Sequence, residues 1–186
     1  VTNRIAAGRD LSLRAAGGLS ASGTFTAGRD ATLAASGGAA AIGGTVSAGG
    51  GVAIGAGTSL QSNATVQASG GMAISAGADM VLATLHRAGT TLDITAGGGL
   101  DGSGTLSAGG AATIRAGQSM SLQGLVQAGS TLTLSAGGNL AFAATGSAGG
   151  AVEASAGGNF SQAGTMTGTA AFLSAGGMHS QSGQVT

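Results

Sequence analysis

Residues 45–60 read TVSAGGGVAIGAGTSL, a stretch in which β-branched, small apolar and glycine residues follow one another in a fixed order. The Ala48-Gly49 pair of this stretch, or a close variant of it, returns along the whole chain at intervals of 20 or 21 residues. The Ala of this pair is found at Ala7, Ala27, Ala48, Ala68, Ala88, Ala108, Ala128 and Ala148. A constant period of this length predicts an architecture of stacked repeats.

Apolar residues recur at fixed distances from this Ala. Six residues after it stand Leu13, Leu33, Ile54, Ile74, Ile94, Ile114, Leu134 and Ala154. Twelve residues after it stand Leu19, Ala39, Leu60, Met80, Leu100, Met120, Leu140 and Phe160. Two residues before it stand Ile5, Phe25, Val46, Val66, His86, Leu106, Val126 and Gly146. Within a unit, as in residues 92–96, apolar and polar residues alternate, which indicates a strand.

A unit of three short strands and three corners cannot close a core by itself, because both of its faces stay open. Stacking identical units covers those faces and pairs each strand with its neighbours. We therefore predict an all-β fold, a parallel β-helix or solenoid of triangular cross-section with about nine coils of 20 residues. The usual hand of parallel crossovers makes a right-handed helix the expectation. Residues 1–186 form a single β-helix domain in this interpretation, an internal fragment of a longer fibre.

The composition excludes several classes of function. The chain has 40 Gly, no Pro and no Cys, and its six basic residues balance six acidic ones. Zero net charge argues against binding of nucleic acid and of anionic membranes, and no apolar run is long enough to insert into a membrane. Without Cys there are no disulfides and no thiolate metal sites.

Glycines and short polar residues mark the predicted corners. We expect the glycines to adopt positive φ there, and Asn139 and Asn159 to stack as an amide ladder. The coil that contains Gly146 lacks a branched side chain in a core slot, so Phe142 and Phe160 are expected to fill it. A regular row of Thr could bind ice, but cross-strand pairing of β-branched residues explains it better.

Three arginines are the candidate binding residues. Arg9-Asp10 and Arg29-Asp30 are expected at equivalent corners of adjacent coils, where opposite charges can interleave as a solvated cluster. As an alternative, Arg9, Arg29 and nearby Arg14 contact sulfate or carboxylate groups of a glycan.

His86 stands in an apolar slot and has three interpretations: a metal ligand or general base, a hydrogen-bonded interior imidazole, or a residue that a bulge turns outward. No matching His or carboxylate lies one coil away, which favours the last two. The acids Asp79, Asp93, Asp101 and Glu153 are scattered over different slots, unlike the paired acids of glycosidases. We therefore expect no enzyme activity, no catalytic or metal residues and no cofactor.

The pattern from Thr45 to Leu60 resembles the 20-residue haemagglutinin repeat, and the resemblance covers essentially the whole chain. It is similar to the shaft of filamentous haemagglutinin and of related two-partner-secreted exoproteins. The resemblance implies a secreted or surface-displayed Gram-negative virulence protein, exported through an outer-membrane partner.

Two functions agree with this resemblance. The first is a structural shaft segment of an adhesin, which mediates or presents adhesion to host-cell glycans or receptors. The alternative is the stick segment of a contact-dependent growth-inhibition toxin. Open strand edges at the ends of such a fragment also predict end-to-end self-association.

Overall fold

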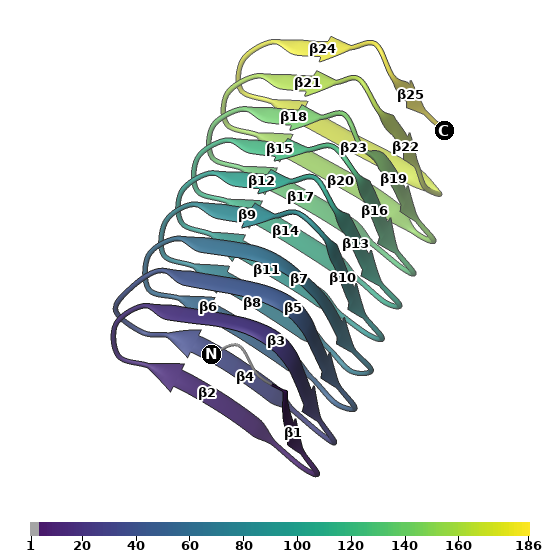
Figure 1. Ribbon diagram of the computed structural model, residues 1–186. Coiled ribbons are helices and arrows are strands. Elements are labelled where there is room, and N and C mark those ends of the chain that lie inside the picture. Colours follow the sequence, from purple (N-terminus) through teal and green to yellow (C-terminus); the bar gives the residue numbers. More distant parts are fainter. Residues whose placement is uncertain (1–3) are drawn as a thin grey trace.

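The computed structural model describes residues 4–186, which contain 25 β-strands and no helix. The chain winds into a solenoid with its two ends at opposite ends of the stack (Figure 1). Every pair of neighbouring strands is parallel, and each strand pairs with the strand one coil away. The predicted parallel β-helix of about nine coils is therefore confirmed.

Each coil has up to three sides. The first side is a nine-stranded sheet of β2 (Leu11–Ala15), β4 (Ala31–Ala35), β6 (Val52–Ala56), β8 (Met72–Ala76), β11 (Leu92–Ala96), β14 (Ala112–Ala116), β17 (Leu132–Ala136), β20 (Ala151–Ala156) and β23 (Ala170–Ala175). The second side contains β9 (Met80–Leu82), β12 (Leu100–Gly102), β15 (Met120–Leu122), β18 (Leu140–Phe142), β21 (Phe160–Gln162) and β24 (His179–Gln181). The third side contains β1 (Ile5–Ala7), β10 (Leu85–Ala88), β13 (Thr105–Ala108), β16 (Leu125–Ala128), β19 (Thr145–Ala148), β22 (Thr165–Thr167) and β25 (Gln184–Val185).

Three longer strands join the second and third sides into one 16-stranded sheet. They are β3 (Leu19–Ala27), β5 (Ala40–Ala48) and β7 (Leu60–Ala68). Each runs without a break through the corner between the second and third sides, which we call the third corner. The sequence predicts three short strands in every unit. That prediction is wrong for these coils, where one strand of nine residues covers two sides.

The register places like residues over like. Leu33 pairs with Leu13 on one side and with Ile54 on the other, and the same ladder continues through Ile74 and Ile94. These inward side chains are almost fully buried over most of the length. Alternating burial along most strands, as in β8, confirms the period of two that the sequence indicates.

One position of the predicted ladders is wrong. Leu19 pairs with Ala40, not with Ala39, and Ala40 in turn pairs with Leu60. The 21-residue unit carries its additional residue between Ala35 and Ala40, so the exposed Ala39 lies in the corner and the strand begins one residue later. Counting from the Ala-Gly pair alone could not locate this insertion.

Lack of space, rather than backbone conformation, explains most corner glycines. Among residues 4–186 only Gly23 and Gly44 have positive φ, +130° and +82°. At Gly109, by contrast, a Cβ would lie 2.1 Å from the carbonyl oxygen of Gly89 in the preceding coil. The expectation of positive φ at every corner is therefore wrong, because the corners need glycine chiefly where successive backbones approach closely.

The corner between the first and second sides uses side-chain oxygens. Oδ1 of Asn139 accepts the backbone N–H of Asn159 at 2.8 Å, and Oδ1 of Asn159 accepts that of Met178 at 2.9 Å. Asp79 binds the N–H of Gly99 in the same way, at 2.8 Å. The predicted amide ladder is wrong: each side chain satisfies a backbone donor of the next coil instead of another amide.

Phe142 fills the thinned core as expected. A Cβ at Gly146 would lie 2.7 Å from Cζ of Phe142, so the ring occupies the space that a side chain at 146 would take. Phe160 is fully buried, and its ring stacks on His179 with centroids 4.9 Å apart.

Candidate functional site

The arginine corner is built from two adjacent coils. Arg9 and Arg29 occupy the same slot, with the backbone N–H of Arg29 donating to the carbonyl of Arg9 at 3.0 Å. The guanidinium of Arg29 reaches back to Asp10, where its Nε donates to Oδ1 at 3.0 Å. The interleaving of charges expected from the sequence is therefore present.

This ion pair occupies the Arg29 guanidinium. A second hydrogen bond joins Nη2 to Oδ2 of Asp10, so the contact is bidentate. The hydrogen bond from Arg29 lowers the pKa of Asp10, and the same bond raises the pKa of Arg29. Both side chains are exposed to solvent, so the pair contributes little to stability.

The other two candidate arginines lie apart from this pair. Arg9 makes no ion pair or side-chain hydrogen bond within residues 4–186, so its guanidinium is free to meet a ligand. Arg14 lies five residues further along the coil, in β2, and its Nε donates to Oγ of Ser12 at 3.1 Å. Five residues span at most about 17 Å when fully extended, and the corner at residues 8–10 shortens the distance between the two backbones. The structure brings Arg9 and Arg29 together and leaves Arg14 on the first side.

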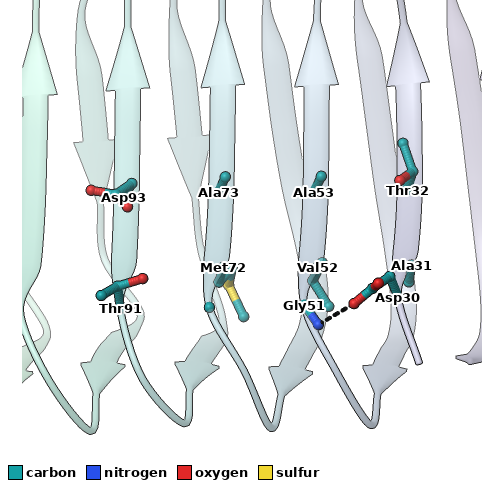
Figure 2. A pocket seen from close by; sticks show the side chains of 11 residues that line it. Asp30, Ala31, Thr32, Gly51, Val52, Ala53, Met72, Ala73, Thr91 and Asp93 are labelled. Atoms are coloured by element: carbon teal, nitrogen blue, oxygen red, sulfur yellow. Dashed lines mark hydrogen bonds between the residues drawn. The ribbon is translucent and has the colours of Figure 1, made fainter. Parts of the chain in front are cut away.

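A shallow hollow of about 280 Å³ opens on the first side, across β4, β6, β8 and β11. Its floor is made by the short side chains of Ala53 and Ala73, with Thr32 at one end and Asp93 at the other (Figure 2). This hollow was not predicted from the sequence. The sequence marks it by two small residues, Ala53 and Ala73, which stand between Thr32 and Asp93 in the same outward slot of successive coils.

The hollow has no catalytic arrangement. Asp30 lies at one end, where its Oδ1 accepts the backbone N–H of Gly51 at 2.7 Å, and Asp93 lies at the other end (Figure 2). The two acids are three coils apart, about 14 Å at 4.8 Å per coil. This exceeds the separation of roughly 5–9.5 Å that glycoside hydrolysis by two carboxylates uses.

His86 is fully buried in β10, between Val66 and Leu106 of the neighbouring coils. Its Nδ1 lies 3.2 Å from the carbonyl oxygen of Thr84, which can only accept, so Nδ1 donates. Nε2 then accepts the hydroxyl of Ser62 at 2.9 Å. The interior hydrogen-bonded imidazole is the correct interpretation, and an outward-turned His86 is wrong.

Burial decides the chemistry of His86. Removal from water lowers its pKa to about 4, although the hydrogen bond to the Thr84 carbonyl acts in the opposite direction. Both ring nitrogens are in hydrogen bonds and no atom of the ring reaches solvent. The Ser-His pair therefore resembles a nucleophile and its base in composition only, since no substrate can approach it.

Ser62 is the partner that sequence reasoning missed. Its slot is inward and holds Ala21, Ile42, Ser62, Leu82, Gly102, Leu122, Phe142 and Gln162. A polar residue in this apolar ladder is a readable signal once the ladder has been written out. Gln162 is the other such residue, and its Nε2 donates to the carbonyl of Gln184 at 2.9 Å.

No group of three or more His, Asp or Glu residues within 4–186 could hold a metal ion. The described part of the chain also contains no helix long and apolar enough to span a membrane.

The family model of the haemagglutinin repeat matches residues 2–41, 32–84, 87–146 and 143–185, which together cover nearly the whole chain. Neither a curated protein nor a solved structure gives a match.

Proposed function

This chain belongs to the haemagglutinin-repeat family, and we propose that it is a rigid shaft segment of a bacterial surface fibre, which holds the adhesive part of that fibre toward host cells. The family is a structural, adhesin-type family whose proteins are generally secreted or surface-associated. Export through an outer-membrane partner belongs to the same proposal.

The observation that carries this proposal is the unbroken register of the coils. Each strand of the first side pairs with the next, from β2 to β23, without a missing partner. At about 4.8 Å per coil, nine coils span a length on the order of 43 Å. A continuous hydrogen-bonded ladder resists bending, which is what a spacer between a cell surface and an adhesive tip requires.

Whole-coil deletions test the spacer role in the parent protein. Removing residues 88–127 deletes two coils and joins Arg87 to Ala128, the residue of the same slot as Ala88. We expect this variant to fold, to shorten the rod by about 10 Å and to retain adhesion to host cells. Removing residues 88–97 deletes half a coil, breaks every ladder and should abolish both folding and adhesion.

The outcome that contradicts the proposal is loss of adhesion after the whole-coil deletion while circular dichroism still reports the folded solenoid. Adhesion would then reside in the shaft itself. Killing of neighbouring bacteria by the parent protein would instead favour the growth-inhibition stick. Product release from acidic polysaccharides would contradict the structural role.

Weak glycan contact at the arginine corner is a separate proposal. Arg9 is its best candidate because its guanidinium is unpaired, whereas Arg29 is engaged by Asp10. Retention on a heparin column should fall in Arg9→Ala and change less in Arg29→Ala. Unchanged retention of both variants would remove this corner as an anion site.

A further inference from the structure

Asn63-Ala64-Thr65 forms the tripeptide Asn-x-Thr, in which the asparagine amide can accept a glycan. It lies in β7, where residues two apart point to the same face of the strand. Ala64 between them is fully buried, and Asn63 is exposed. The folded chain therefore displays both functional side chains of the tripeptide on the outside of the coil.

The amide of Asn63 is free, unlike those of the other asparagines that the structure describes. Asn139 and Asn159 each use Oδ1 to accept a backbone N–H of the next coil. Asn63 makes no side-chain hydrogen bond within residues 4–186. Packing and corner geometry therefore give no reason for an asparagine at position 63.

The surface beside Asn63 has room for a sugar ring. Its register partner in the preceding coil is Gly43, which has no side chain. A shallow hollow of about 180 Å³ lies next to it, lined among others by Gly43, Ala41 and Gln61. The amide of the exposed Gln61 offers a donor and an acceptor for sugar hydroxyl groups.

From the free amide, the outward Asn-x-Thr and the adjoining hollow, we propose that Asn63 is the acceptor of an N-linked glycan. The amide nitrogen attacks the anomeric carbon of an activated glycosyl phosphate, either nucleotide-linked or lipid-linked. A C–N bond forms, the C–O bond to phosphate breaks, and the phosphate leaves with the electron pair while the amide loses one proton. The reaction is a substitution and needs no oxidant or reductant.

The transfer precedes closure of the coil. β7 is paired with β5 on one side and with β9 and β10 on the other, so the folded strand cannot enter a transferase as a free segment. Because Asn63 points outward, the finished coil keeps the sugar without any change in its core.

Peptide mass spectrometry of the protein from cells that naturally produce it tests this directly. Trypsin cleaves after Arg29 and Arg87 and leaves Asn63 in the peptide 30–87. We expect the mass of this peptide to exceed that of its sequence by one or more hexose or N-acetylhexosamine units, with fragmentation placing them on Asn63. An unmodified peptide, or an added mass that survives Asn63→Gln, would overturn the proposal.

Variants of the threonine give the matched controls. Thr65→Val keeps the β-branched shape and should abolish the modification, whereas Thr65→Ser keeps an acceptor tripeptide and should retain it. Thr45→Val changes the same slot one coil earlier, where Gly43 replaces the asparagine, and should have no effect. Modification that persists in Thr65→Val would contradict recognition of the tripeptide.

Two extracts identify the donor. The newly synthesised chain is incubated with labelled nucleotide-diphosphate sugars in a membrane-free extract, or with washed membranes that carry lipid-linked sugars. Labelling in the first extract indicates the nucleotide-linked donor, and labelling that needs the membranes indicates the lipid-linked one. Labelling in neither would count against Asn63 as an acceptor.

Discussion

The coils near the N-terminus and the later coils turn the third corner in different ways (Figure 1). In residues 19–68 each of β3, β5 and β7 passes through the corner as one strand of nine residues. From residue 80 onward the same stretch is two short strands, such as β15 and β16, separated by Gln123 and Gly124. The backbone ladder nevertheless continues, since Leu125 N–H donates to the carbonyl of Gly104 at 3.2 Å. One repeat therefore supports two corner geometries without losing its pairing.

Glycine conformation is one difference between the two regions. Gly23 and Gly44 are register partners in the N-terminal region, and both have positive φ. No residue of the later coils does. A pair of left-handed glycines lets β3 and β5 bend inside a paired strand, a backbone route that residues with a Cβ rarely take.

Side-chain size across the corner is the second point of comparison. The inward residues just before and just after the corner face each other, as Phe142 and Gly146 do. A Cβ at Gly102 would lie 2.7 Å from Cδ2 of Leu122 in the next coil and 3.7 Å from Cδ1 of Leu106 across the corner. In these two coils a large residue lies close to a glycine across the corner, whereas in another coil Leu122 and Val126 are both large and buried. The core volume at this corner is therefore divided differently between the two slots from coil to coil.

The polar cluster of Ser62, Thr84 and His86 lies where the two regions meet. Ser62 belongs to the last continuous strand, Thr84 to the first broken corner and His86 to the first separate strand on the third side after it. Oγ1 of Thr84 also donates to the carbonyl of Ala64. The change of corner geometry thus coincides with buried hydrogen bonds between the two regions.

The largest expected effect concerns the size match at Phe142. Phe142→Ala should lower the free energy of unfolding by about 3–5 kcal/mol because it empties the corner. Gly146→Val alone should cost about 1–3 kcal/mol through its clash with the Phe142 ring. The double variant should be more stable than the sum of the two effects predicts, by urea unfolding. Additivity within about 0.5 kcal/mol would contradict the shared volume.

Acid should destabilise the junction through His86. Its folded pKa of about 4 lies below the ordinary value of 6.5, so the unfolded state binds more protons between these pH values. Stability is therefore full above about pH 6.5, falls as the pH drops toward 4, and loses about 3 kcal/mol in total at 1.36 kcal/mol per pKa unit.

The control for this prediction is His86→Leu combined with Ser62→Ala, which removes both partners of the buried hydrogen bond. It gives position 86 the leucine that the next coil has at the equivalent position, Leu106. Urea unfolding at pH 7 and pH 4 measures the difference between the two proteins. An equal loss of stability in both would show that other groups cause the acid sensitivity.

The strands that bend through the third corner in the N-terminal region should depend on Gly44 and not on its neighbour Gly43. Gly44→Ala forces a Cβ onto a residue with φ of +82° and within 2.1 Å of the Gly23 carbonyl oxygen, and should cost about 1–3 kcal/mol. Gly43→Ala meets only Cβ of Ser22 at 3.6 Å and should change stability by less than about 1 kcal/mol. Thermal unfolding compares the two variants. Similar melting temperatures would contradict the role of positive φ.

Side-chain oxygens at the corner between the first and second sides should have a smaller effect. Asn159→Ala leaves the N–H of Met178 without its partner and should cost about 1 kcal/mol. Asn63→Ala removes an amide that makes no hydrogen bond and should leave the unfolding midpoint unchanged. Equal effects in urea unfolding would show that the corner oxygens do not stabilise the later coils.

The smallest effect belongs to the exposed ion pair of the first two coils. Arg29→Ala should leave the melting temperature almost unchanged because both side chains are in water. Titration of Asp10 by NMR measures the effect of this variant. The pKa of Asp10 should rise toward its ordinary value when the Arg29 hydrogen bond is lost. An unchanged pKa of Asp10 would show that the pair does not persist in solution.

The sequence predicts the coil and most of its ladders because inward residues such as Leu13, Leu33 and Ile54 return at the period of the coil. It also predicts the match between Phe142 and Gly146, since a missing side chain near a large one is visible in the letters. It does not predict Ser62 as the partner of His86. These residues are 24 apart and meet only through the stacking of two coils.

Period and composition by themselves therefore determine the solenoid, its family and the side of each strand that faces the core, because each of these depends on one coil and its repetition. Tertiary structure alone decides where the inserted residue of the 21-residue unit goes, which glycines need positive φ, and whether the third corner bends or breaks. Those features depend on the distance between one backbone and the next, a quantity of about 4.8 Å that leaves space for a hydrogen bond and, at many corners, none for a Cβ.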